Sequence, residues 1–162
     1  WGLRCVYSTL EMSDCLIENN LINGANFRDS EVTLAQNRIT GNRRGLYLQR
    51  SQGRLVGNLI ERNSEHGIFL EDSDGMVESN RIAGNGRSGL RVINSPVELI
   101  RNQVVENDLY ALINDGDQDL DLTGNWWGTT DQAELDLLIR DGRDREGYGL
   151  VRIVDPLKSQ PL

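Results

Sequence analysis

Four columns of residues recur every 21 to 22 positions along this chain of 162 residues, and this repeat constrains the fold more than any other feature. A unit of this length cannot bury its apolar face alone, so neighbouring copies must stack against one another. The glycine, serine and two asparagine columns are Gly2, Gly24, Gly45, Gly67 and Gly89; Ser8, Ser30, Ser51, Ser73 and Ser95; Asn37, Asn58, Asn80 and Asn102; and Asn20, Asn42, Asn63, Asn85 and Asn107.

Between these columns the apolar residues alternate with a period of two, which is typical of strands and not of helices. One inward column follows the glycines: Leu3, Ala25, Leu46, Ile68, Leu90 and Leu112. A leucine-rich repeat would need leucines where this chain has asparagine and other polar residues. The pattern therefore predicts three very short parallel strands per coil, with coils about 4.8 Å apart.

The asparagine columns fall where the chain turns. Asparagine tolerates left-handed backbone and can pass hydrogen bonds from one copy to the next, so we expect structural ladders in these columns. Cys15 takes the first slot of one column, where we expect a small buried residue. Cys5 is inward on the strand pattern, which favours a free packed thiol over a disulfide.

The recurring pattern Asn-x-Ile-x-x-Asn, then Gly-Leu/Ile-x-Leu/Val-x-x-Ser, as in Asn58 to Ser73, resembles a known repeat. It is similar to the right-handed parallel β-helix repeat of the pectate-lyase-like superfamily, in particular to the NosD-like and the carbohydrate-binding and sugar-hydrolysis repeat proteins. The stretch Gly124 to Asp131, which contains Trp126 and Trp127, resembles the end of many secreted bacterial β-helices. The resemblance implies a secreted, cell-surface or periplasmic protein, but superfamily members range from lyases, hydrolases and epimerases to adhesins and scaffolds.

The fold class expected is therefore all-β: a right-handed single-stranded parallel β-helix of about six coils of 21–23 residues over 1–130, with a C-terminal cap over 131–162. Asp131 and Glu134 form a capping box, Leu135, Leu138 and Ile139 lie on one helical face, and Gly142 is placed to end the helix. The segment 148–154 is expected to be a final strand. Because the first coil begins at Gly2 without a cap, we expect further coils or another domain before Trp1.

Charge and composition exclude several partners. The net charge of −8 argues against nucleic acid, which needs a basic face, and no apolar run is long enough to insert into a membrane. One histidine, two cysteines and two methionines leave little for a transition-metal site. His66, before Gly67, is expected to be an exposed turn residue.

Alternating carboxylates between Asn114 and Asp121 suggest a calcium loop, since they present hard oxygens to one ion. Leu120 and Trp126 stand where such a loop requires glycine and a bidentate glutamate. Strand alternation predicts instead that the four carboxylates lie on one solvent face: Asp115, Asp117, Asp119 and Asp121. We therefore expect no cofactor and no metal ligands, with calcium as the alternative. Trp127 falls in an inward column and is expected to plug the core.

The candidate ligand-binding residues lie on the outer face of the first strand: Arg28, Tyr47, Phe69 and Arg91. Tyr47 and Phe69 are in adjacent coils, so their rings are expected about 5 Å apart, with Arg91 one coil beyond and Arg28 diagonal to them. Such a stripe could stack sugar rings and pair with their carboxylates. The alternative is that it only shields the sheet.

No catalytic residues are assigned. Glu71 and Asp115 are the acids of the neighbouring file, two coils apart with Ile93 between them, and Lys158 lies in the tail. The sequence thus favours a non-catalytic exported module that binds acidic or neutral polysaccharide or serves as an assembly scaffold, with another protein or further coils at its uncapped N-terminal end. The alternative is the C-terminal part of a polysaccharide lyase or glycoside hydrolase whose active residues precede Trp1.

Overall fold

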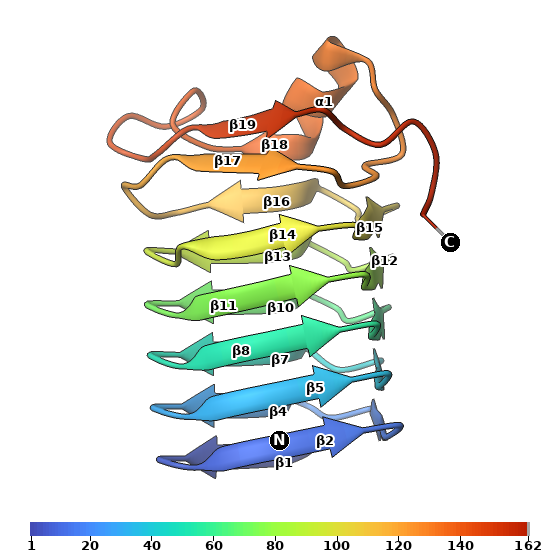
Figure 1. The fold of residues 1–162 in the computed structure, drawn as a ribbon, viewed down its shortest axis with the longest axis vertical. Coiled ribbons are helices and arrows are strands. Elements are labelled where there is room, and N and C mark those ends of the chain that lie inside the picture. Colours follow the sequence, from blue (N-terminus) through green and yellow to red (C-terminus); the bar gives the residue numbers. More distant parts are fainter. Residues whose placement is uncertain (162) are drawn as a thin grey trace.

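The computed structural model describes residues 1–161 and shows a parallel β-solenoid. Successive coils stack from the first strand at the bottom of Figure 1 to the cap at the top. Sheet A consists of β1 (Leu3–Val6), β4 (Asn23–Arg28), β7 (Arg44–Gln49), β10 (His66–Glu71), β13 (Ser88–Ile93), β16 (Tyr110–Asn114) and β18 (Ile139–Arg140). Sheet B consists of β2 (Thr9–Ser13), β5 (Glu31–Ala35), β8 (Gln52–Val56), β11 (Asp74–Glu78) and β14 (Val97–Ile100). Sheet C consists of β3 (Leu16–Glu18), β6 (Arg38–Thr40), β9 (Leu59–Glu61), β12 (Arg81–Ala83) and β15 (Gln103–Val105).

Residues of one repeat column pair with each other across neighbouring strands, so the repeat sets the register of the sheets. Phe69 pairs with Tyr47 on one side and Arg91 on the other, and all strand pairs within these three sheets are parallel. Five coils carry all three strands. The sixth has β16 and β17 (Leu120–Thr123), but only an isolated bridge between Gln103 and Trp126 stands in place of the third strand. The prediction of three strands per coil is confirmed, and the number of complete coils is slightly smaller than predicted.

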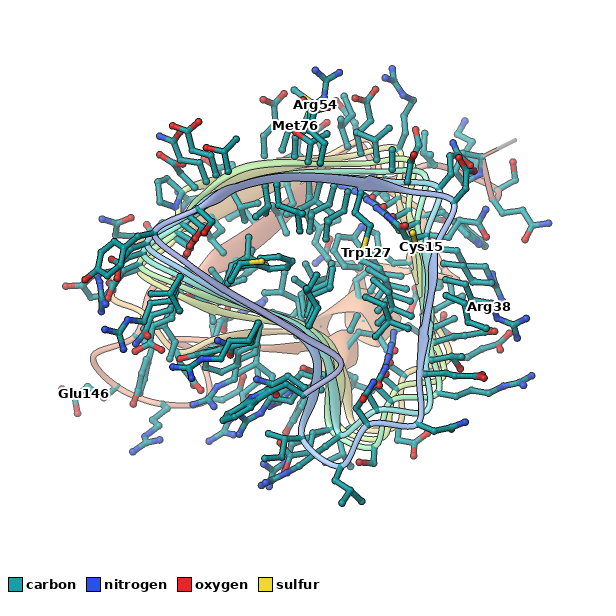
Figure 2. All side chains as sticks on the ribbon, turned by 90° about the horizontal axis from the view of Figure 1, so that it is seen from below. Cys15, Arg38, Arg54, Met76, Trp127 and Glu146 are labelled. Atoms are coloured by element: carbon teal, nitrogen blue, oxygen red, sulfur yellow. The ribbon has the colours of Figure 1, made fainter. Side chains whose placement is uncertain are left out.

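The core fills the interior of the coils. Its inward columns are buried almost completely, including Leu46, Ile68, Leu90 and Leu112 at 0 % exposure. Viewed along the solenoid, Trp127 points inward, whereas Arg38, Arg54 and Met76 point outward (Figure 2). Trp127 is 2 % exposed, which confirms its predicted place in the core.

Side-chain ladders run along the corners of the coils, as predicted. In the ladder from Asn37 to Asn125, each Oδ1 accepts the N–H of the residue one coil earlier, including Cys15 in the first rung. The left-handed backbone belongs to the residue before each asparagine, such as Ser79 with φ 56°, and not to the asparagine itself. Cys15 is exposed, contrary to expectation, while Cys5 packs against the core, and both thiols are free.

The cap follows the sixth coil. Helix α1 (Gln132–Leu138) begins after Asp131, whose side chain accepts the N–H of Glu134 at 3.1 Å. The helix ends earlier than predicted, because Ile139 turns away to begin β18 and extends sheet A. The final strand is also shorter than predicted: β19 (Val151–Val154) pairs with β17.

Candidate ligand-binding face of sheet A

The outer face of sheet A carries two adjacent files of side chains. One file precedes the glycine column and contains Asn23, Arg44, His66, Ser88 and Tyr110. The other lies three positions further on and contains Asn26, Tyr47, Phe69, Arg91 and Ile113. Within one coil the two files touch: the Asn23 side-chain amide donates to Asn26 Oδ1 at 3.0 Å, and the rings of His66 and Phe69 lie 5.9 Å apart.

Phe69 lies at the centre of a compact group that we call the Phe69 cluster: Arg44, Tyr47, His66, Phe69 and Arg91. The ring centroids of Tyr47 and Phe69 are 4.7 Å apart, close to the spacing expected from the repeat. The guanidinium carbons of Arg91 and Arg44 lie 4.7 Å and 5.7 Å from the Phe69 centroid. These neighbours cover Phe69, which is only 6 % exposed.

Arg28, the fourth predicted residue, is not brought into this cluster. It lies two positions further along sheet A, in register with Gln49, and its Nε pairs with Asp29 at 3.3 Å. Asp29 also holds Arg50. The structure therefore brings together Tyr47, Phe69 and Arg91 and directs Arg28 towards the following turn.

Each of the two arginines in the cluster is bound by a carboxylate through its Nε alone. Arg91 Nε contacts Asp115 at 2.9 Å, and Arg44 Nε contacts Glu65 at 3.0 Å. Within residues 1–161, the terminal guanidinium nitrogens of both arginines make no hydrogen bond, and the side chains are 31 % and 28 % exposed. Carboxylates thus fix the position of two planar donor groups whose outer edges are available to a ligand.

Tyr47 is a neutral donor in this cluster. Its hydroxyl donates to the Glu71 carboxylate, and the side chain is half-buried. Burial, reinforced by this hydrogen bond, raises the pKa of Tyr47 to about 12. The phenol is therefore protonated at neutral pH.

His66 is the residue that sequence reasoning missed. It is 2 % exposed in β10, so the expectation of an exposed turn residue is wrong: Phe69 and Ser88 pack against it. Its Nδ1 lies 2.6 Å from Ser88 Oγ, and that hydroxyl donates to the Leu90 carbonyl. Nδ1 is therefore the donor in this pair, and Nε2 of the neutral ring is unprotonated.

Burial, together with the charge of Arg91, lowers the pKa of His66 to about 4. His66 occupies the same repeat position as Arg44 and Ser88, directly before the glycine column. This shared position is the sequence signal that could have placed His66 on this face.

The aspartate run does not form one face, contrary to the prediction. The chain turns a corner between β16 and β17, so Asp115 pairs with Arg91 on sheet A. Asp119 and Asp121 instead pair with Arg152 of β19. Within residues 1–161, no three His, Cys, Asp or Glu side chains form a group that could hold a metal ion, and no helix is long and apolar enough to cross a membrane.

A stacked parallel β-helix is the class of protein that this geometry defines. The sequence profile described as "right handed beta helix region" matches residues 4–126, and the chain belongs to this family. No curated protein matches the chain in sequence.

Among solved structures, the chain is similar in fold to the periplasmic alginate epimerase AlgG, with 19 % identity and a TM-score of 0.62. It is also similar to a double mutant of AlgG, with 20 % identity and a TM-score of 0.65. In both comparisons the match covers 96 % of this chain and 47 % of the AlgG chain, so the chain spans about half the length of those structures.

Proposed function

We propose that this chain is an exported, non-catalytic β-helix module that binds an acidic polysaccharide along the outer face of sheet A. The single observation that carries the proposal is the Phe69 cluster. It places the available guanidinium edges of Arg44 and Arg91 on either side of one aromatic centre. Guanidinium groups bind carboxylates through paired N–H donors, and the Tyr47 ring adds an apolar surface on which a sugar ring can stack.

The spacing of the coils suits a polymer ligand. Neighbouring strands lie about 4.8 Å apart, which is close to the length of one sugar ring in an extended chain. Tyr47, Phe69 and Arg91 occupy three successive coils of sheet A. A polysaccharide running along the solenoid axis would therefore present consecutive rings to consecutive coils.

The solved structures support the class of ligand and the compartment. The similar chains come from an alginate epimerase described as periplasmic, which acts on a polysaccharide of acidic sugars and lies outside the cytoplasm. The fold likeness supports export and carbohydrate binding as proposals for this chain.

Calorimetric titration with an acidic oligosaccharide, such as an oligouronate, tests the proposal. Arg91→Gln and Arg44→Gln should each weaken binding by about tenfold or more, because each removes a charge-assisted hydrogen bond to a carboxylate. Arg81→Gln is the matched control: Arg81 lies on sheet C and donates to Gln103 at 2.9 Å, away from the cluster. It should leave binding unchanged.

The outcome of this titration separates the module from a pure scaffold. Weakening confined to the sheet A variants supports the proposal. If neither acidic nor neutral oligosaccharides bind the intact chain at millimolar concentration, the Phe69 cluster only shields the sheet, and the assembly role becomes the better function.

A polysaccharide lyase is the second candidate, favoured by the presence in the Phe69 cluster of a neutral His66 with an unprotonated Nε2, Tyr47 and two arginines. His66 is 2 % exposed, so this reaction requires the side chains that cover it to move aside. An arginine would then pair with the substrate carboxylate, His66 would take the proton on the adjacent carbon, and the Tyr47 hydroxyl would give its proton to the departing glycosidic oxygen as a C=C bond forms. An ultraviolet assay for the unsaturated product tests this. Product formation that His66→Gln abolishes supports the lyase. If the intact chain forms no unsaturated product, the binding module is favoured, or an active site outside this chain.

A further inference from the structure

Arginines occur on every second strand along the outer face of sheet A. The strand order of this sheet is β1-β4-β7-β10-β13-β16-β18. Arg44 and Arg91 of the Phe69 cluster lie on β7 and β13, with β10 between them. The register continues the file of Arg91 to Arg4 on β1 and to Arg140 on β18. The two files of this face therefore carry an arginine on β1, β7, β13 and β18.

The strands between these four place uncharged side chains in the same two files. They are Asn23 and Asn26 on β4, His66 and Phe69 on β10, and Tyr110 and Ile113 on β16. Arg28 of β4 lies outside the two files and pairs with Asp29. Positive charge in the two files thus has a period of two strands, or about 9.6 Å.

The side chains of Arg44 and Arg91 do not spread much further apart than their strands. Their guanidinium carbons lie 5.7 Å and 4.7 Å from the same Phe69 centroid, so they are at most about 10 Å apart, the sum of the two distances. Arg4 is exposed and Arg140 is half-buried. Within residues 1–161 neither Arg4 nor Arg140 takes part in an ion pair, so both charges are available to a ligand.

Carboxylates lie beside two of the strands that have no arginine in these files. Glu71 ends β10, and Asp115 directly follows β16. Each would repel a ligand carboxylate that lay over its own strand. The charges of the protein thus attract a ligand carboxylate at β7 and β13 and oppose one at β10 and β16.

We propose that the outer face of sheet A recognises a polysaccharide in which every second sugar ring presents a carboxylate to the protein. The proposal rests on the proposed function and assigns two further binding residues, Arg4 and Arg140. Because one sugar ring matches one coil, a repeat of two rings matches the spacing of the arginines. A ligand of three rings covers only the Phe69 cluster, whereas a ligand of about seven rings spans the six strand spacings from β1 to β18, about 29 Å.

Calorimetric titration of the whole chain with two octasaccharides tests this proposal. One alternates glucuronate with N-acetylglucosamine, and the other is an octagalacturonate with a carboxylate on every ring. The alternating ligand should bind at least as tightly, although it has half as many carboxylates. Arg4→Gln and Arg140→Gln should each lower its affinity by about two- to fivefold, because each removes one guanidinium–carboxylate contact at a partly exposed site. Their thermal unfolding midpoints should stay close to that of the parent chain.

Arg54→Gln is the matched control, because Arg54 is an exposed, unpaired arginine that points outward from sheet B (Figure 2). It should leave binding unchanged. Tighter binding of octagalacturonate, no loss in Arg140→Gln, or an equal loss in Arg54→Gln would each overturn the two-ring repeat. If Arg91→Gln still weakens binding in that case, polysaccharide binding at sheet A stands without the repeat. If neither octasaccharide binds the parent chain, the proposed function and this inference both fail.

Discussion

At the scale of single residues, His66 carries the clearest physical signature of the outer face. An imidazole that is covered by Phe69 and bonded to Ser88 is costly to charge. The pKa of His66 in the folded chain is about 4, against an ordinary value of 6.5. The unfolded chain therefore binds more protons than the folded chain between these two values, and the folded state loses stability as the pH falls through this window.

We predict that the free energy of unfolding falls by about 2 kcal/mol between pH 7 and pH 5 because of His66 alone. Urea unfolding at the two pH values measures the total change, which includes the carboxylates. His66→Gln removes the imidazole and should reduce the pH dependence by that amount. An identical pH dependence in the variant and the parent chain would show that His66 titrates normally.

At the scale of elements, the asparagine ladder joins consecutive coils at a corner. Asn80 Oδ1 accepts from both nitrogens of Asn58, at 2.8 Å from the backbone and 3.0 Å from the side chain. Its own side-chain nitrogen donates to the Leu55 carbonyl at 2.8 Å and to Asn102 Oδ1 at 3.1 Å. One buried amide thus satisfies polar groups in the coils on both sides of its own and links three successive coils.

Asn80→Ala should therefore lower the free energy of unfolding by about 2 to 5 kcal/mol, because several buried groups lose their partners at once. Asn20→Ala, in the first rung of the other ladder, should cost about 1 kcal/mol, since Asn20 is only half-buried and its side chain only donates, to Glu18 and Asn42. Denaturant unfolding of both variants gives the comparison. Similar losses at the two positions would mean that the ladder does not stabilise the interior more than the end.

The ladder also explains which elements could be predicted from sequence. A position that faces the same neighbour in every coil must keep the same residue type, so Asn58, Asn80 and Asn102 reveal both the period and the register. The cap has no repeat. Its helix boundary depends on Ile139 joining sheet A, a tertiary contact that local sequence signals do not contain.

At the scale of the whole molecule, regular stacking makes it predictable which residues are neighbours on an outer face. It does not make predictable how their side chains pack against one another. The contact between Tyr47 and Phe69 followed from the period alone. The burial of His66 did not, because it depends on how Phe69 and Ser88 fold over it. Nor did the absence of Arg28 from the Phe69 cluster, because Arg28 pairs with Asp29 instead.

The central functional claim is that an acidic polysaccharide binds the outer face of sheet A at the Phe69 cluster. Titration of the isotopically labelled chain with an oligouronate, followed by nuclear magnetic resonance, tests it most directly. Binding at the Phe69 cluster should confine the shifted signals to β7, β10 and β13, with the largest changes at Arg44, Tyr47 and Arg91. Shifts confined to sheet B or sheet C, or no shifts at millimolar ligand, would contradict it.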